Sequence, residues 1–355
     1  MYNQDLFDTP SAYFASANGY DGFRSYFDTV FNPRDYSRIY VLKGGPGTGK
    51  SSLMKRLLND TYFSNFTREA IFCSSDPNSL DGVIISSDKG SVAVIDGTAP
   101  HECDAKIPGA RDEIINLGQM WNKGALISNA EEITRLNEEK KRHYKAAYYY
   151  LSFAGKYSTV REEIIDNAYK KNDVPTIEEL LADISERVQY SEEKTRLISA
   201  FGKNGYMRQP NSFNNAKRKV YVKGIYGSDN LFLKRLLELS RYRGLSFVRF
   251  PSPLSDKITE AIYYTDEDFV IISGESGETC IDTGKFLQKK AIEENKGILD
   301  FLAAGEEDVL RRSANEFSIV SGIHFALEKI YTQAMNFGEI DNVFLNMKTE
   351  ISNII

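Results

Sequence analysis

Residues 39–58, IYVLKGGPGTGKSSLMKRLL, combine three structural signals in one short stretch of the chain. An apolar, β-rich run (Ile39–Leu42) comes first, then a glycine-rich segment, and then an amphipathic helical pattern from Ser51 to about Leu58. The glycine-rich segment fits the pattern G-x-x-x-x-G-K-[ST] at every position. The stretch therefore predicts a strand, a phosphate-binding loop and a helix in direct succession.

Each residue type in this loop has a physical role. Glycines permit positive φ and leave no side chain in the way, so successive backbone N–H groups can surround a phosphate. The N-terminus of the following helix favours the same anion. We expect Lys50 to lie between the β- and γ-phosphates of a nucleotide and Ser51 to offer its hydroxyl to Mg²⁺. The predicted cofactor-binding residues are Gly44, Gly45, Pro46, Gly47, Thr48, Gly49, Lys50, Ser51 and Ser52.

A second buried-strand pattern, Val92–Asp96, ends in a carboxylate. Such an acid suits the second anchor of Mg²⁺ at the carboxyl edge of a sheet, so Ser51 and Asp96 are the predicted metal ligands. Many ATPases carry a second acid directly after the strand acid, but here Asp96 is followed by Gly97. If water attacks the nucleotide, an acid or a histidine from a loop near the γ-phosphate would have to position or deprotonate it. Asp76, Asp81 and His101 are the candidates, although each is also an ordinary residue of a turn. The predicted catalytic residues are Lys50, Asp96, Asp76, Asp81 and His101.

A transition-state arginine is also expected in a site of this kind. Arg111, which follows the strand acid, and Arg249, further along the chain, are the candidates. Solvated surface arginines are the commoner alternative for both.

The chain repeats itself. A second version of the opening stretch, VYVKGIYGSDNLFLKRLL, occupies residues 220–237. Three ordered matches at a nearly constant offset indicate two similar domains, which we place at residues 1–195 and 196–355. The aligned pairs are 14–23 with 197–206, 43–58 with 223–237, and 92–97 with 269–274, and the last register places Cys103 on Cys280.

The second copy lacks the working residues of the first. In this alignment Lys50 meets Asn230, Gly49 meets Asp229, and Asp96 meets Ser273. Both the phosphate-neutralising lysine and the metal-anchoring acid are lost. We therefore expect one nucleotide site and an inactive twin that is structural or regulatory, and that could act as a lid across a pseudo-twofold interface.

Strands that alternate with helices predict an α/β fold of the P-loop NTPase type. We expect a mostly parallel sheet, duplicated, with helical segments after each copy. Further strands are predicted at residues 70–73 and 92–95. Apolar residues recur at three- and four-residue steps from Ile133 to Tyr157, and the tail beyond Lys285 is also helical in pattern.

Composition narrows the class of protein. The chain has 355 residues, 41% hydrophobic and 26% charged, with a net charge of -6. This balance gives no global attraction to nucleic acid, and the basic run Lys217–Lys219 is typical of a solvated strand edge. There is no secretion signal or membrane-spanning run, and three scattered cysteines predict neither disulfides nor a zinc site. A cytoplasmic protein without a membrane or nucleic-acid partner is expected.

The segments KGGPGTGKSSL, CSSDPNSLDGVII, VAVIDGTAPH and PGARDEIINLG together resemble an uncharacterised bacterial family of duplicated P-loop ATPases. The resemblance covers essentially the whole chain and implies ATP or another nucleotide at residues 44–52, without implying a known reaction. Relatives tend to keep a more intact glycine loop in the second half. Asp229 and Asn230 depart from that pattern and argue against two-site ATP binding here.

The leading functional hypothesis is Mg²⁺-dependent binding and hydrolysis of ATP at the first loop. Adenine is preferred over guanine because the sequence has no N-K-x-D motif. A small-molecule or nucleotide kinase is the second hypothesis, since no acid follows Asp96. The third is an ATP-dependent switch that contacts a protein partner through its second half.

Overall fold

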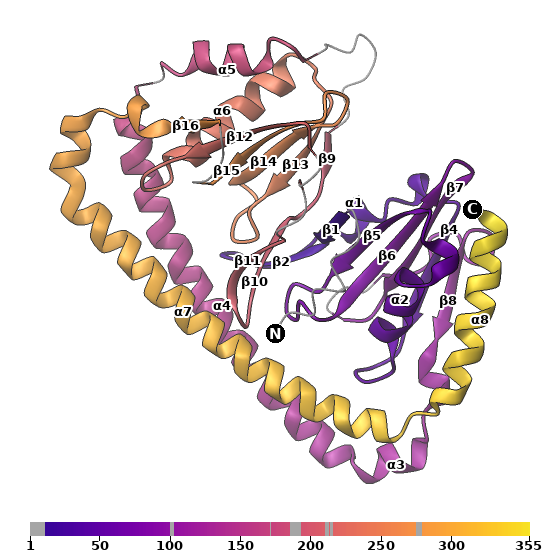
Figure 1. The fold of residues 1–355 in the computed structure, drawn as a ribbon. Coiled ribbons are helices and arrows are strands. Elements are labelled where there is room, and N and C mark those ends of the chain that lie inside the picture. Colours follow the sequence, from indigo (N-terminus) through magenta and orange to yellow (C-terminus); the bar gives the residue numbers. More distant parts are fainter. Residues whose placement is uncertain are drawn as a thin grey trace.

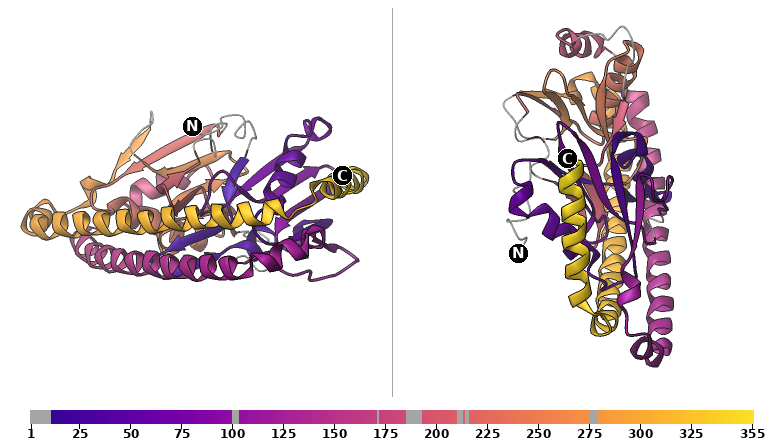
Figure 2. Two further views of the ribbon diagram at one scale, coloured as in Figure 1. Left: turned by 90° about the horizontal axis from the view of Figure 1, so that it is seen from below. Right: turned by 90° about the vertical axis from the view of Figure 1, so that its right-hand side faces the viewer.

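A computed structural model describes residues 11–99, 103–170, 172–184, 193–209, 213, 216–274 and 279–355. Two six-stranded sheets lie on one side of a pair of long helices, and each sheet is accompanied by a two-stranded hairpin (Figures 1 and 2). The protein is therefore an α/β protein with mixed, mostly parallel sheets. No helix within the described ranges is both long enough and apolar enough to cross a membrane.

In the first sheet the strand order is β1-β5-β6-β7-β4-β8, and every strand except β6 runs in the same direction. β4 lies between the parallel strands β7 and β8. Its buried residues pack on both faces of the sheet, Tyr40 and Leu42 in one apolar cluster and Val41 in another. The strands are β1 (Ser11–Phe14), β4 (Arg38–Lys43), β5 (Thr67–Phe72), β6 (Leu80–Ser87), β7 (Gly90–Asp96) and β8 (Asp112–Asn116), with the hairpin β2 (Ser16–Gly19) and β3 (Gly22–Ser25).

The second sheet has the same topology. Its order, β9-β13-β14-β15-β12-β16, matches that of the first strand by strand, and β14 is the strand that runs against the others. This identity is compatible with a duplicated fold. The strands are β9 (Glu193–Thr195), β12 (Arg218–Lys223), β13 (Phe247–Pro251), β14 (Thr259–Tyr264), β15 (Phe269–Ser273) and β16 (Cys280–Asp282), with the hairpin β10 (Ser199–Gly202) and β11 (Gly205–Arg208).

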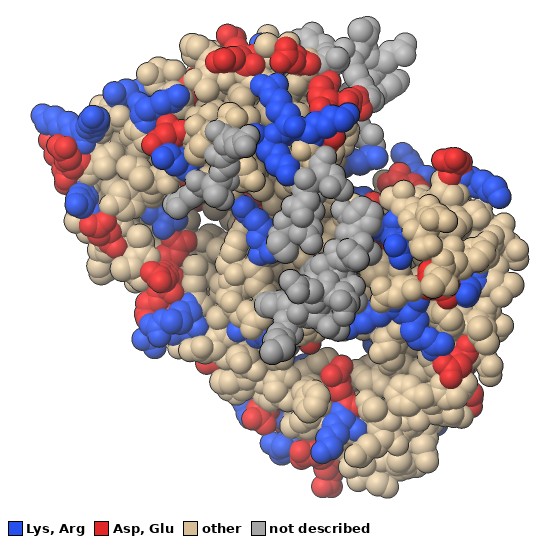
Figure 3. All heavy atoms as spheres, in the orientation of Figure 1, with Lys and Arg blue, Asp and Glu red and all other residues tan. Residues whose placement is uncertain are grey.

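Two long antiparallel helices, α4 (Ala130–Ala168) and α7 (Lys289–Gln333), pack against each other along most of their length (Figure 1). Basic and acidic side chains are interspersed along the edge of the molecule that these helices form in Figure 3. Ion pairs at i,i+3 and i,i+4, such as Arg135–Glu139, support the helices. The other helices are α1 (Phe27–Val30), α2 (Lys50–Leu58), α3 (Lys123–Ser128), α5 (Val174–Leu181), α6 (Ser228–Tyr242) and α8 (Phe337–Ile354), with 3₁₀ turns at Pro33–Asp35, Thr61–Phe63, Leu117–Met120 and Thr283–Phe286.

Because α4 and α7 cross the molecule in opposite directions, each copy's last helix covers the other copy's sheet. α8 follows the second copy, but its apolar side chains belong to the core of the first sheet. α5 follows the first copy, and its apolar side chains belong to the core of the second sheet. The buried residues concerned are Ile340, Phe344, Met347 and Ile351 of α8 and Ile177, Leu180 and Leu181 of α5.

The two halves also meet through equivalent parts. Phe14 donates its amide to the carbonyl of Leu197, the residue aligned with it in the repeat, at 2.8 Å. The β2–β3 hairpin lies against the loop after β13, where the Tyr20 amide donates to the Leu254 carbonyl at 2.8 Å. In return, the β10–β11 hairpin lies against the loop after β5, since a Cβ added at Gly202 would be 2.8 Å from the Ser74 carbonyl oxygen.

The sequence-based strands at 39–42, 70–73 and 92–95 and the helix at 51–58 are confirmed as β4, β5, β7 and α2. Strict alternation of strands with helices is wrong, because β5, β6 and β7 follow one another as antiparallel neighbours. The connections 73–79 and 88–89 consist of turns and bends and contain no helix. The boundary after residue 195 stays a prediction; β9, just before it, pairs with β13 in the second sheet.

The proposed equivalence of Cys103 and Cys280 is also wrong. Cys280 lies in β16, whose counterpart is β8, whereas Cys103 precedes β8. The connection 97–111 is longer than 274–279, so the alignment loses its register after β7 and β15. All three cysteines, Cys73, Cys103 and Cys280, are free thiols.

Candidate functional site

The glycine loop, residues 44–49, joins the end of β4 to the start of α2. Gly47 has φ 69° and Gly49, which caps α2, has φ 83°, so both need the left-handed region that glycine adopts without strain. A Cβ at Gly44, whose φ is 150°, would come within 2.9 Å of Thr48 Oγ1. The sequence GGPGTG is therefore what lets the chain turn this tightly.

Lys50 is the first residue of α2, and its side chain turns back across the loop. Nζ donates to the carbonyl oxygens of Gly44 at 2.7 Å and Gly45 at 2.9 Å, and lies 3.7 Å from Asp96 Oδ2. Burial lowers the pKa of Lys50, while Asp96 opposes this shift. Within the described residues, no backbone hydrogen bond has the amide of Gly45, Gly47 or Gly49 as its donor. Lys50 therefore lies beside loop amides that the backbone hydrogen bonds of the described residues do not use.

Asp96 lies where the sequence predicts it, at the carboxyl end of β7 and in register with Leu42 of β4. Its Oδ1 accepts from the Thr98 amide at 2.9 Å and from Thr98 Oγ1 at 2.5 Å, which leaves Oδ2 toward Lys50. Burial raises the pKa of Asp96, and Lys50 opposes the shift. Ser51 Oγ accepts from the Leu80 amide at 2.9 Å and so ties α2 to the start of β6.

The structure brings together part of the expected catalytic set. Asp81, buried near the start of β6, interacts electrostatically with both Lys50 and Asp96. Asp76 lies in the loop after β5 and forms an ion pair with Lys203 at 3.1 Å. His101 lies outside the described residues. Lys50, Asp96 and Asp81 are therefore one cluster, and Asp76 faces a cation from the second half.

Neither candidate arginine is at this site. Arg111 donates to both carboxylate oxygens of Asp112, at 2.5 and 2.7 Å, and to the Pro33 carbonyl at 2.9 Å. It precedes β8 and lies at the end of the sheet where β4 begins, opposite the end that carries the glycine loop. There its carbonyl accepts from the Ile39 amide at 3.2 Å. The expectation that Arg111 reaches the glycine loop is wrong, because its half-buried side chain is bound to Asp112 and to the Pro33 carbonyl.

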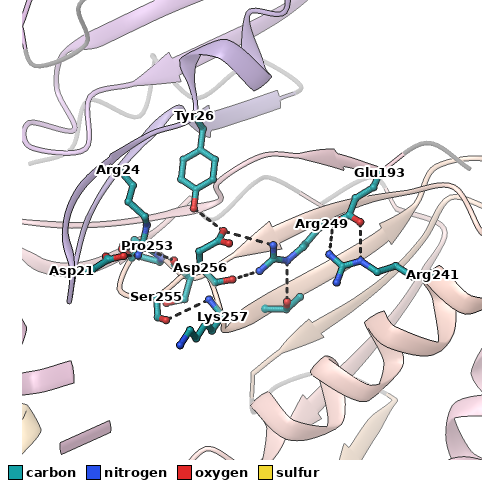
Figure 4. A network of polar contacts seen from close by, with 12 residues as sticks. Asp21, Arg24, Tyr26, Glu193, Arg241, Arg249, Pro253, Ser255, Asp256 and Lys257 are labelled. Carbon is teal, nitrogen blue, oxygen red and sulfur yellow. Dashed lines mark hydrogen bonds and ion pairs between the residues drawn. The ribbon is translucent and has the colours of Figure 1, made fainter. Parts of the chain in front are cut away.

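Arg249 belongs to the contact between the two halves (Figure 4). It binds Thr259 Oγ1 at 3.2 Å, and its Nη1 lies 3.6 Å from a carboxylate oxygen of Asp256. The Asp256 carboxylate also accepts from the Tyr26 hydroxyl of the first half at 2.9 Å. Arg249 is committed to these partners, so its candidacy as a transition-state arginine is wrong as well.

Side chains that the sequence did not point to complete the surroundings of the loop. The last turns of α7 lie over it: a Cβ at Gly47 would be 2.6 Å from the Glu328 carbonyl oxygen, and Thr332 Oγ1 donates to the Gly47 carbonyl at 3.4 Å. Burial and Asp76 raise the pKa of Glu328, and Lys50 opposes the shift. Burial, followed by Lys140 of α4, lowers the pKa of His324 to about 4, so its imidazole is neutral at pH 7.

The only tryptophan of the chain also packs on the loop. Trp121 and Tyr331 have ring centroids 5.4 Å apart, and a Cβ at Gly45 would be 3.3 Å from the Trp121 indole. No local sequence signal could have found these neighbours, since Trp121 and α7 are far from residue 45 along the chain.

In the second copy, residues 224–227 replace the longer loop 44–49. Gly227, with φ 89°, caps α6 as Gly49 caps α2, so Ser228 takes the position of Lys50. The expected pairings of Lys50 with Asn230 and of Gly49 with Asp229 are therefore wrong by two residues, because the cap fixes the register. No lysine occupies the position in either register.

The pairing of Asp96 with Ser273 is confirmed, since Ser273 stands opposite Val222 as Asp96 stands opposite Leu42. Ser273 Oγ donates to Asp229 Oδ2 at 2.6 Å, so the second copy's own side chains occupy the space beside its loop. A carboxylate next to this short loop would repel phosphate.

Comparison with protein-family models, curated proteins and solved structures finds no match to this chain. The family resemblance given by the motifs therefore stays a prediction.

Proposed function

We propose that the chain is a nucleotide-binding protein of the P-loop type, like the duplicated P-loop ATPases that its motifs resemble. It binds ATP with Mg²⁺ at the glycine loop of the first copy and hydrolyses it. The observation that carries this proposal is the position of Lys50. Its ammonium donates to the Gly44 and Gly45 carbonyls and lies 3.7 Å from Asp96, beside loop amides that donate no backbone hydrogen bond within the described residues. Phosphate oxygens are the acceptors that such donors bind most strongly.

The residues beside the loop fit Mg²⁺. Ser51 and Asp96 offer a hydroxyl and a carboxylate oxygen, and this cation prefers such hard oxygen ligands. When bound there, Mg²⁺ would neutralise charge on the β- and γ-phosphates. Asp81, which interacts with both Lys50 and Asp96, is the acid we propose for positioning water.

A second candidate function, an ATP-dependent switch, is favoured by the contacts of α7 with the loop. Thr332 and the Glu328 carbonyl lie against Gly47, so occupancy of the loop bears directly on the end of α7. The second half, which carries α7, would then present the change to a protein partner. We place the protein in the cytoplasm, where its three free thiols would persist.

The decisive test is titration calorimetry with Mg²⁺ and a non-hydrolysable ATP analogue, using wild type and Lys50→Ala. We expect one site per chain. Loss of the ammonium should weaken binding by roughly 10- to 150-fold, since a charge-assisted hydrogen bond contributes about 1.5–3 kcal/mol. Trp121 emission, which reports on the loop directly, should change in the same titration. Lys290→Ala, on α7 where the side chain is 88% exposed, is the matched control and should bind as wild type does.

Two sites, or full binding by Lys50→Ala, would contradict the proposal. Steady-state phosphate release that disappears in Lys50→Ala supports the ATPase over the switch. Slow release that one acceptor compound accelerates would instead indicate a kinase.

A further inference from the structure

The tip of the β10–β11 hairpin carries a lysine from the second copy to the first. Gly202 packs on the Ser74 carbonyl, which leaves no room for a side chain there. The Asn18 side-chain amide donates to the Phe201 carbonyl at 2.8 Å and fixes the hairpin from the first half. Lys203, which follows Gly202, therefore projects from a hairpin turn that the first half holds in place.

Lys203 joins three separate parts of the molecule. Its Nζ lies 3.1 Å from Asp76 Oδ1, in the loop after β5, and 3.2 Å from Ser321 Oγ, on α7. The Lys203 side chain is 21% exposed, so most of it is shielded from water. An ammonium has three N–H donors, and these two contacts use two of them within the described residues.

Lys203 and Lys50 interact electrostatically with the same two side chains of α7. Lys50, Lys140 and Lys203 all interact electrostatically with both His324 and Glu328 on α7. Burial lowers the pKa of Lys140, which comes from α4. Three lysines from three different parts of the chain therefore lie near the same stretch of α7, whose Glu328 carbonyl lies against Gly47. Several positive charges close together favour an anion that carries several negative charges.

The hairpin of the first copy has no such lysine. Tyr20 occupies the equivalent turn and donates to Glu306 at 2.5 Å, and the Glu306 carboxylate pairs with Arg161. That hairpin lies against the copy whose glycine loop is degenerate. The lysine is thus found on the hairpin that lies against the copy with the intact glycine loop.

We propose that Lys203, supplied by the second copy, contacts the terminal phosphate of the nucleotide bound at the first copy's glycine loop. The inference rests on the proposed nucleotide site. It assigns the inactive copy a chemical part in that site: Lys203 exchanges Asp76 for a phosphate oxygen when a triphosphate binds. The second copy is then needed for recognition of the triphosphate as well as for packing.

The test compares a triphosphate with a diphosphate. The non-hydrolysable ATP analogue and ADP, each with Mg²⁺, are titrated into wild type, Lys203→Ala, Lys203→Arg, Lys50→Ala and the control Lys290→Ala. We expect Lys203→Ala to weaken binding of the analogue by about 10- to 150-fold and to leave ADP binding unchanged. Lys203→Arg, which keeps the charge, should recover most of the loss, and Lys50→Ala should weaken both ligands.

Equal weakening of both ligands by Lys203→Ala would mean that the lysine only supports the loop, and would overturn the inference. Unchanged binding of both ligands by Lys203→Ala, with Lys50→Ala still defective, would overturn it while leaving the proposed site intact. Wild-type binding of both ligands by Lys50→Ala would remove the site and the inference together. Thermal unfolding of each variant shows whether it is folded.

Discussion

At the scale of single residues, Gly47 links the glycine loop to the rest of the molecule. Its φ of 69° excludes a Cβ without strain, and the Glu328 carbonyl and Thr332 hydroxyl of α7 fill the space where that Cβ would stand. The glycine is needed twice, once for the turn and once for the close approach of a helix from the other copy.

Gly47→Ala should therefore destabilise the protein more than an ordinary substitution at positive φ. The left-handed backbone costs about 1–2 kcal/mol for alanine, and displacement of the α7 backbone adds roughly 1–3 kcal/mol. Gly109→Ala is the matched control, because Gly109 has φ 75° with nothing within 4 Å of the added Cβ. Urea unfolding measures both, and equal losses of free energy in the two variants would show that α7 does not press on the loop.

At the scale of elements, α8 is the helix that closes the first core. Its buried side chains Ile340, Phe344, Met347 and Ile351 pack with residues such as Leu57 of α2 and Tyr40 of β4. At about 1.5–3 kcal/mol for each buried apolar side chain, these four supply roughly 6–12 kcal/mol as an upper estimate. That is comparable with the whole free energy of unfolding of a typical domain.

Ile351→Ala should lower the free energy of unfolding by about 2–5 kcal/mol, because Ile351 is fully buried and its loss leaves a cavity. Leu345→Ala, on the same helix where the side chain is 56% exposed, should change it by less than about 0.5 kcal/mol. Chemical denaturation followed by circular dichroism gives both values. A small effect of Ile351→Ala would mean that α8 is not part of the first core.

At the scale of the whole molecule, the two copies are joined by exchange of their terminal helices. α5 completes the second core and α8 completes the first, so the chain is built like a domain-swapped dimer whose two subunits are one polypeptide. The isologous contact of Phe14 with Leu197 lies between the copies, at aligned positions. Neither copy contains everything that its own sheet needs.

Fragments 1–184 and 193–355 should consequently fail to fold alone and should associate when they are co-expressed. Each lacks the helix that covers its sheet and exposes the apolar face of the helix it carries. Co-purification with a single tag and thermal unfolding test this. A cooperative transition in either fragment by itself would contradict the exchange.

Much of the candidate site could be predicted from sequence because its signals are local. The glycine loop, Lys50 and the strand acid Asp96 lie within patterns of a few residues, and the structure brings Lys50 and Asp96 within 3.7 Å of each other. The register of the second loop could not be predicted, because only the left-handed cap at Gly227 shows where α6 begins. The antiparallel path of β6 was missed, since a short apolar run does not reveal its direction.

Short patterns in the sequence were enough to predict the strand–loop–helix unit at residues 39–58, the repeat, and the loss of lysine and acid from the second copy. These features depend on which residue types stand a few positions apart, and such short-range patterns specify local backbone conformation. The tertiary structure alone shows that α8 returns to the first sheet and that Glu328 and Trp121 lie against the first loop. Many apolar helix faces have the same sequence pattern. Packing of the complete chain therefore decides which faces meet and which distant side chains come close to one another.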